Sequence, residues 1–182
     1  MLCISAEEFL FWKKKQLSKG GDKQSLSVLI DCMGGISISD QNLISINPKR
    51  NLHFKKNLEF LESLWDDHLL NASPIQHLCG ITFWRDLKLK VTNKVLIPRP
   101  ETELIVDIVF NIFRKKSEKF FFAELGTGSG AISIALALSY PLSEGAATDI
   151  DQDALEIATK NFVNHSKQSN LKFYCGNWWS PL

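Results

Sequence analysis

The stretch "FFFAELGTGSGAISIALALSY", residues 120–140, decides the fold. The apolar run at 119–125 is typical of a buried strand, and residues 131–140 are typical of a helix that ends before Pro141. Between them glycine stands at every second position, at Gly126, Gly128 and Gly130. Glycine permits a tight turn and lets a ligand lie against bare backbone, and the following helix start offers unpaired N–H groups. The stretch therefore predicts a ligand site between a strand and a helix.

The same alternation of strand and helix continues toward the C-terminus. Residues 145–150 and 171–176 are expected strands, and 151–166 is an expected helix with acidic residues in its first turn. Alternating strands and helices at this spacing predict a parallel sheet with right-handed crossovers. Asp149 stands near the end of the second strand, about 20 residues beyond the glycine loop, where such a fold places a carboxylate that binds a ribose diol. A nucleoside ligand is therefore expected.

The residues leave two nucleoside ligands open. "GTGSGA" at 126–131 fits the loose dinucleotide pattern, which would make the protein a nicotinamide enzyme. Glu124 stands directly before the loop, where an acidic side chain would repel a pyrophosphate and would suit a cationic ligand. S-adenosylmethionine carries an ammonium and a sulfonium group together with a ribose and an adenine. Glu124 and Asp149 together favour S-adenosylmethionine, and a purely structural turn is the third reading.

The chain before the loop divides into a helical part and a hairpin. Helices are expected from Ser5 to about residue 19, from 25 to a stop at Gly34 and Gly35, and from 53 to 71. Residues 81–98 alternate in polarity and predict a hairpin with its turn near Arg85 and Asp86. A helix follows, begun by Thr102 or by the turn before it. Its expected apolar face consists of Leu104, Ile105, Ile108 and Ile112.

Composition excludes several classes of protein. Hydrophobic residues make up 45% of the 182 residues and charged residues 23%, with a formal net charge of +1. This is ordinary globular material with no generic attraction to nucleic acid or to a membrane surface. The four cysteines are far apart and have no metal-ligand spacing, so we expect reduced thiols, no metal site and a cytoplasmic protein. No signal peptide and no membrane-spanning run is expected.

Four segments resemble one known family. They are "SPIQHLCG" at 73–80, "IPRPETE" at 97–103, "ELGTGSGAISIALA" at 124–137 and "ATDIDQDALEIATKN" at 147–161. They resemble the HemK/PrmC methyltransferases, and the resemblance covers roughly residues 70 to 182. It implies transfer of a methyl group from S-adenosylmethionine to the side-chain amide nitrogen of the glutamine in the Gly-Gly-Gln loop of class 1 peptide chain release factors.

The resemblance also implies an α/β architecture. A small N-terminal helical bundle at 1–73 would recognise the substrate, and residues 74–98 would form a linker with a β-hairpin. Residues 99–182 would be the N-terminal part of a Rossmann-like methyltransferase domain. The implied cofactor-binding residues are Glu124, Gly126, Thr127, Gly128, Ser129, Gly130, Asp149, Asn177 and Trp178. A segment with Arg99, Thr102 and Glu103 would close over the cofactor.

The sequence departs from the family pattern in two places. Asn177 stands where the family usually has aspartate, which would accept a hydrogen bond from the adenine amino group. The family's Asn-Pro-Pro-Tyr motif, which fixes the substrate amide, does not occur in the 182 residues. No catalytic residue is therefore assigned, and we expect an incomplete and inactive portion of the enzyme. The alternatives are another S-adenosylmethionine-dependent methyltransferase, and a non-catalytic remnant or binding module.

Overall fold

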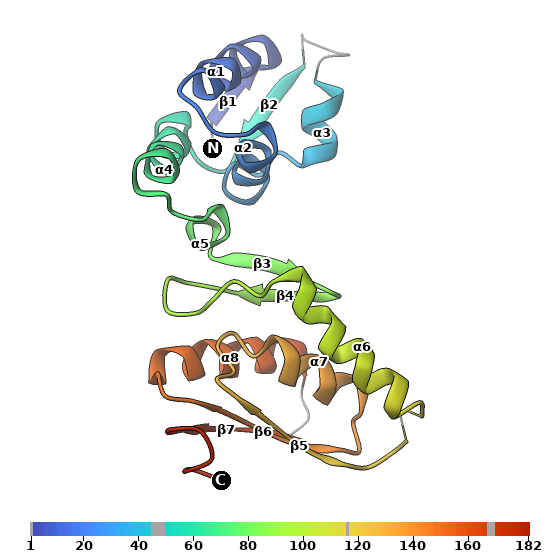
Figure 1. The fold of residues 1–182 in the computed structure, drawn as a ribbon. Helices are drawn as coiled ribbons and strands as arrows, with labels where there is room; N and C mark the ends of the chain where they lie inside the picture. Colours follow the sequence, from blue (N-terminus) through green and yellow to red (C-terminus); the bar gives the residue numbers. More distant parts are fainter. Residues whose placement is uncertain (1, 45–49, 116, 167–169) are drawn as a thin grey trace. The chain divides into compact units, whose positions relative to one another are not determined.

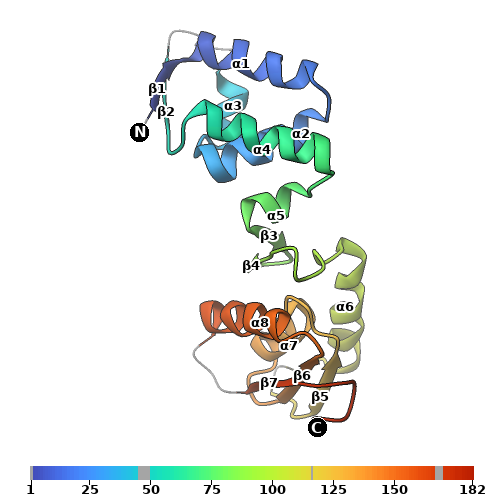
Figure 2. The same ribbon diagram turned by 90° about the vertical axis from the view of Figure 1, so that its left-hand side faces the viewer.

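The computed structural model describes residues 2–44, 50–115, 117–166 and 170–182. The chain divides into two compact units, Met1–Cys79 and Gly80–Leu182, which contain the elements labelled in Figures 1 and 2. The hairpin expected in a linker lies within the second unit. The domain boundaries that the family resemblance implies, after residues 73 and 98, stay a prediction. Among the described residues, no helix has the length and apolar character needed to cross a membrane.

The first unit combines helices with a short two-stranded antiparallel sheet. Its elements are β1 (Leu2–Ser5), α1 (Ala6–Ser18), α2 (Lys23–Leu29), the π-helical turn η1 (Ile30–Gly34), α3 (Ile38–Leu43), β2 (Asn51–Phe54), α4 (Leu58–Asn71) and α5 (Ile75–Cys79). The expected helix start at Ser5 is confirmed, since its side chain and that of Glu8 form a reciprocal capping box. The expected stop is confirmed too, because Gly35 is left-handed with φ of 78°.

The expectation of an entirely helical first unit is wrong at two places. Leu2–Ser5 pairs with Asn51–Phe54 as antiparallel strands, and α4 begins only at Leu58, with Asn57 as its cap. Phe54 was predicted to belong to the helix because it lies four residues before Leu58 and so fits the helical period. It also lies two residues after Leu52, and this second period is the one that the structure uses, with both side chains buried.

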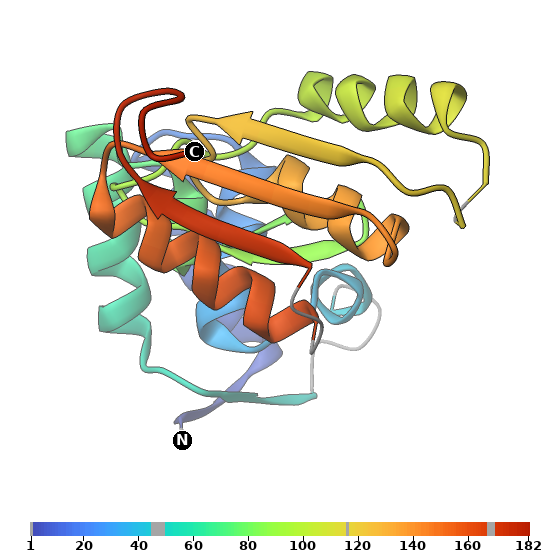
Figure 3. The same ribbon diagram turned by 90° about the horizontal axis from the view of Figure 1, so that it is seen from below.

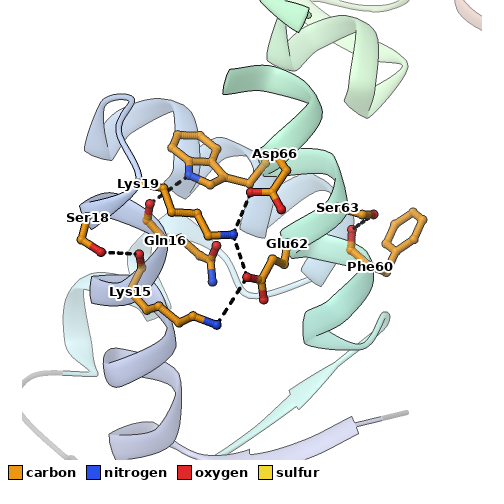
Figure 4. A network of polar contacts seen from close by, with 9 residues as sticks. Lys15, Gln16, Ser18, Lys19, Phe60, Glu62, Ser63 and Asp66 are labelled. Carbon is orange, nitrogen blue, oxygen red and sulfur yellow. Dashed lines mark hydrogen bonds and ion pairs between the residues drawn. The ribbon is translucent and has the colours of Figure 1, made fainter. Parts of the chain in front are cut away.

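Polar contacts join α1 to α4 at the edge of the first core (Figure 4). The Nζ atom of Lys19 lies 2.7 Å from a carboxylate oxygen of Glu62 and 2.7 Å from one of Asp66. Beneath this surface the indole of the buried Trp65 donates to the carbonyl of Gln16 at 3.2 Å. The ion pairs are partly exposed and contribute little on their own. The buried Trp65 therefore gives the two helices a contact that is shielded from solvent.

The second unit combines a hairpin with a parallel sheet and helices. Its elements are β3 (Ile81–Trp84), β4 (Leu87–Lys90), the 3₁₀ turn η2 (Pro100–Thr102), α6 (Glu103–Ile112), β5 (Phe121–Leu125), α7 (Ala131–Ser139), β6 (Glu144–Asp149), α8 (Gln152–His165) and β7 (Leu171–Cys175). The sheet has the order β5-β6-β7 and is parallel throughout. Figure 3 shows α7 and α8 lying across one face of the sheet. The expected hairpin, its turn and the parallel α/β architecture are confirmed.

Two expectations about burial in this unit are wrong. The strand around Phe121 was expected to be buried, yet this side chain is 84% exposed, because neighbouring residues of a strand point to opposite faces and only Phe122 points toward the helices. In α6 the expected apolar face is also largely exposed, and Val106 is the buried residue. Glu103, Asp107 and Asn111 form one polar stripe along that helix and leave a wide apolar arc, so its pattern did not reveal which part of the arc packs. Thr102 makes no side-chain cap, and the 3₁₀ turn that it ends leads directly into the helix.

Candidate cofactor site

A pocket of about 310 Å³ opens at the carboxyl ends of the three parallel strands. Its lining comes from the residues at or just beyond each strand end: Leu125, Gly126, Thr148, Asp149, Ile150, Gly176, Asn177 and Trp178. Ligands of open α/β sheets bind at this edge, because the loops there leave a crevice and the backbone N–H groups of the following helices point toward it. The site predicted from the glycine loop therefore coincides with a pocket.

The three glycines of the loop have left-handed backbone conformations but different surroundings. Their φ angles are 75° at Gly126, 54° at Gly128 and 82° at Gly130. A Cβ atom at Gly126 or Gly128 would meet nothing within 4 Å, whereas one at Gly130 would lie 3.1 Å from Cβ of Ala158 in α8. The first two positions therefore leave open space for a ligand, and only Gly126 lines the pocket. Gly130 instead lets α8 approach the back of the loop.

Glu124 supports the loop from beneath. Its Oε2 atom accepts a hydrogen bond of 2.7 Å from the hydroxyl of Thr127 and one of 3.0 Å from the backbone N–H of Ser133 in α7. Burial raises the pKa of this carboxyl above its ordinary value, and the charge of Asp149 acts in the same direction, while the two hydrogen-bond partners oppose them. The side chain is mostly buried and does not line the pocket. The Glu124 carboxylate therefore already accepts a hydrogen bond from a backbone N–H group in the first turn of α7.

Asp149 does line the pocket and is held in place by backbone donors. Its Oδ2 accepts from the N–H of Gly128 at 2.9 Å, and its Oδ1 accepts from the N–H of Asp151 at 3.1 Å. A carboxylate has about four acceptor positions, so both oxygens keep capacity for hydroxyl groups of a ligand. The register places Asp149 opposite Cys175, at the matching end of the next strand. The carboxylate is thus fixed at the position where a ribose diol is expected.

Residues beyond β7 form the other wall of the pocket. Asn177 and Trp178 both line it, as the sequence predicted. Trp178 has a left-handed backbone with φ of 50°, its carbonyl accepts from Thr148 Oγ1 at 3.2 Å, and its ring is 66% exposed. An exposed indole at a pocket wall offers a flat apolar surface for an aromatic base. The pocket therefore has a carboxylate on one side and an aromatic side chain on the other.

The chain is similar in sequence to several known proteins of one kind. The chain is 41% identical over 180 residues to the release factor glutamine methyltransferase of Prochlorococcus marinus. The match covers 98% of this chain and 61% of that protein. It is 34% identical over 188 residues to the release factor glutamine methyltransferase of a Synechocystis strain. This match covers 98% of this chain and 62% of that protein. The chain is homologous to the release factor glutamine methyltransferases. The family resemblance expected from the sequence is confirmed.

The chain spans about three fifths of the length of these release factor glutamine methyltransferases. No family model matches it. Among solved structures, the N-terminal domain of human METTL16 is similar over 74% of this chain and 48% of that one, with 18% identity and a TM-score of 0.44. The assignment of the second unit to the α/β class accordingly rests on its own parallel sheet and helices.

The segment that would close over the cofactor in this family contacts the hairpin here. The backbone carbonyl of Arg99 accepts from the indole N–H of Trp84 at 2.9 Å. A carboxylate oxygen of Glu103 accepts from the backbone N–H of Arg85 at 3.4 Å. Thr102 ends the 3₁₀ turn between them. None of the three segment residues is among the described residues that line the pocket, so their closure over a cofactor stays a prediction.

Structure and sequence differ most in which loop residues reach the pocket. Thr127 and Ser129 are buried at 5% and 3% exposure and support the loop from within. Leu125, Thr148, Ile150 and Gly176 line the pocket without having been predicted. Leu125, Ile150 and Gly176 are the last residues of expected strands and Thr148 lies two residues before such an end, and that position is the signal that could have identified them. The fully buried Asn161 in α8 was missed too, although a polar residue at an apolar position of that helix marks it in the sequence.

Proposed function

We propose that the pocket binds S-adenosylmethionine, and that the chain is the cofactor-binding part of a cytoplasmic enzyme that methylates the glutamine of the Gly-Gly-Gln loop in class 1 peptide chain release factors. The observation that carries the cofactor is the pairing of bare backbone at Gly126 with the fixed carboxylate of Asp149 at adjoining strand ends. The substrate class is supported by the names of relatives that match 98% of the chain.

The residues of the pocket suit the parts of this cofactor. Open space at Gly126 accommodates the methionine and ribose portion, and Asp149 accepts hydrogen bonds from the ribose hydroxyls. Trp178 offers its ring to the adenine, and the amide oxygen of Asn177 accepts from the adenine amino group. The cofactor supplies an activated methyl group on its sulfonium sulfur. The task of these side chains is to bind and orient it.

A nicotinamide dinucleotide is the second candidate, and Glu124 disfavours it. A pyrophosphate at a glycine loop uses backbone N–H groups at the start of the following helix. Here the N–H of Ser133 already donates to the Glu124 carboxylate. A negatively charged group placed there would meet a carboxylate in surroundings of low polarity, where repulsion between like charges is strong. This contact supports a ligand without a pyrophosphate.

Methyl transfer needs an acceptor held in line with the methyl group, and the 182 residues contain no Asn-Pro-Pro-aromatic string to hold an amide. We therefore expect residues 1–182 alone to bind cofactor without transferring its methyl group. Another S-adenosylmethionine-dependent methyltransferase, or a non-catalytic binding module, are the alternatives that the same residues allow.

The test compares residues 1–182 with the complete relative from Prochlorococcus marinus. Each is incubated with a class 1 release factor and S-adenosylmethionine labelled in the methyl group. We expect the complete relative to label the glutamine and residues 1–182 to leave it unlabelled while still retaining the cofactor on a filter. Labelling by residues 1–182 at a comparable rate would place the chemistry within this chain, and labelling of a different acceptor would favour the first alternative.

A further inference from the structure

The side chain of Asn161 joins the glycine loop to the hairpin. It lies in α8, is fully buried, and makes three hydrogen bonds to backbone atoms of two other segments. Its Nδ2 donates to the carbonyl of Ser129 at 2.9 Å and to the carbonyl of Lys90 at 3.0 Å. Its Oδ1 accepts from the N–H of Lys90 at 2.7 Å. A carboxamide is the group that offers two donors and an acceptor in this arrangement.

The contacts between α8 and the hairpin are possible because the spacing of residues along the strand matches the spacing along the helix. The outer edge of β4 presents the backbone N–H groups of Lys88 and Lys90, which are two residues apart and so about 6.6 Å apart along a strand. Asn161 and His165 are one helical turn apart in α8, about 6 Å along the axis. His165 Nε2 accepts from the N–H of Lys88 at 3.2 Å, just as Asn161 accepts from Lys90. The side chains of α8 thus take the place of a neighbouring strand.

The contact on the loop side is the one that matters for a ligand. The Ser129 carbonyl belongs to the loop between Gly126 and Gly130, and its bond to Asn161 draws it toward α8. One turn earlier in α8, Ala158 packs where a side chain at Gly130 would stand. From the other side the loop is fixed by the N–H of Gly128, which donates to Asp149. The peptide groups of the loop are therefore held from both sides, and Asn161 supplies the hydrogen bond from behind.

We propose that Asn161 is a positioning residue for the cofactor: it fixes the glycine loop in its binding conformation by anchoring the Ser129 carbonyl to α8 and the hairpin. This inference rests on the proposed cofactor and adds a residue that does not touch the pocket. Asn161 is absent from the lining, so its effect on binding acts through the loop. Changing its two donors should therefore weaken binding even though every lining residue is intact.

Two variants and a matched control separate this role from general stability. Asn161→Ala removes all three hydrogen bonds. Asn161→Asp has the same shape and keeps the acceptor for Lys90, but it presents an oxygen to two carbonyls. His165→Ala is the control, because it removes a bond from the same helix to the same strand without touching the loop. Dissociation constants for S-adenosylhomocysteine are measured by calorimetry on residues 1–182, alongside the thermal midpoint of each variant.

Both Asn161 variants should raise the dissociation constant at least tenfold, while His165→Ala should change it less than twofold despite a lower thermal midpoint. At acid pH the introduced carboxyl of Asn161→Asp is protonated and regains one donor. The affinity of this variant should then recover in part, when it is compared with the wild type at the same pH. Wild-type affinity in either Asn161 variant, or an equal loss in His165→Ala, would overturn the proposal.

A second measurement needs no ligand and decides the case if a variant binds or folds poorly. Backbone amide exchange is followed at Gly126, Thr127 and Gly130, whose N–H groups are hydrogen-bonded within the site. Exchange at these three should be at least tenfold faster in Asn161→Asp than in His165→Ala. Unchanged exchange would refute the positioning role. Failure of the wild-type chain to bind S-adenosylhomocysteine, with the exchange difference present, would instead refute the proposed cofactor and leave the positioning of the loop standing.

Discussion

At the scale of single residues, two glycines at the loop have different roles, and so do two carboxylates. Gly126 leaves space at the pocket, whereas Gly130 makes room for α8. Glu124 lies beneath the loop and holds it to α7, whereas Asp149 holds the loop and also faces the pocket. The sequence pattern places all four residues in one site, but only the contacts show which of them can touch a ligand.

Replacing Asp149 by alanine should weaken binding of S-adenosylhomocysteine by about 1.5–3 kcal/mol, the range for hydrogen bonds to a charged group. The loss has two sources, because the carboxylate both accepts the ribose hydroxyls and holds the N–H of Gly128. Asp149→Asn is the matched control, since its amide oxygen retains one acceptor, and it should lose less. Calorimetry gives both values. Unchanged affinity in a folded Asp149→Ala variant would contradict the ribose assignment.

At the scale of elements, capping signals were the most reliable part of the sequence. Ser5 begins α1 where expected, because it acts through local hydrogen bonds. Gly35 ends η1 where expected, because it acts through a local φ angle. The pairing of Leu2–Ser5 with Asn51–Phe54 was missed, because strands of four residues carry almost no periodic signal and their partners are far apart in sequence. The core side of α6 was missed because the apolar arc of that helix is wider than the part that packs, and the pattern does not show which part that is.

The capping box of α1 gives a prediction with a pH dependence. Ser5→Ala should destabilise the chain by about 1 kcal/mol, the usual effect of losing a serine cap. Hydrogen bonds from the backbone and then the side chain of Ser5 lower the pKa of Glu8. A lowered pKa means that the Glu8 contribution is present above its ordinary pKa and is lost as the pH falls through the lower value.

Urea unfolding curves at a series of pH values measure this effect. The stability difference between wild type and Glu8→Gln should therefore shrink toward acid pH. Glu7→Gln is the control, because Glu7 is in the same first turn but outside the capping box. An equal pH dependence in the Glu7 variant would show that the helix dipole, and not the box, is responsible.

At the scale of the whole molecule, the described residues form two large hydrophobic cores and one small cluster of Val91, Val95, Ala154 and Ile157. One large core contains Phe9, Phe54 and Trp65, and the second large core contains residues of α7 and the parallel sheet. The pocket, the loop and the contacts that hold it all belong to Gly80–Leu182. The α/β class and the parallel sheet near the loop could be predicted because alternating strands and helices restrict the topology. The Asn161 contacts could not, because they join three segments that are distant in sequence.

We propose above that the pocket takes S-adenosylmethionine and not a dinucleotide. The most direct test is the thermal midpoint of residues 1–182 with S-adenosylhomocysteine, with NAD and without ligand, since a ligand that binds only the folded state raises the midpoint. We expect a concentration-dependent rise with S-adenosylhomocysteine that Asp149→Ala diminishes, and no rise with NAD. A rise with NAD and none with S-adenosylhomocysteine or S-adenosylmethionine would contradict it.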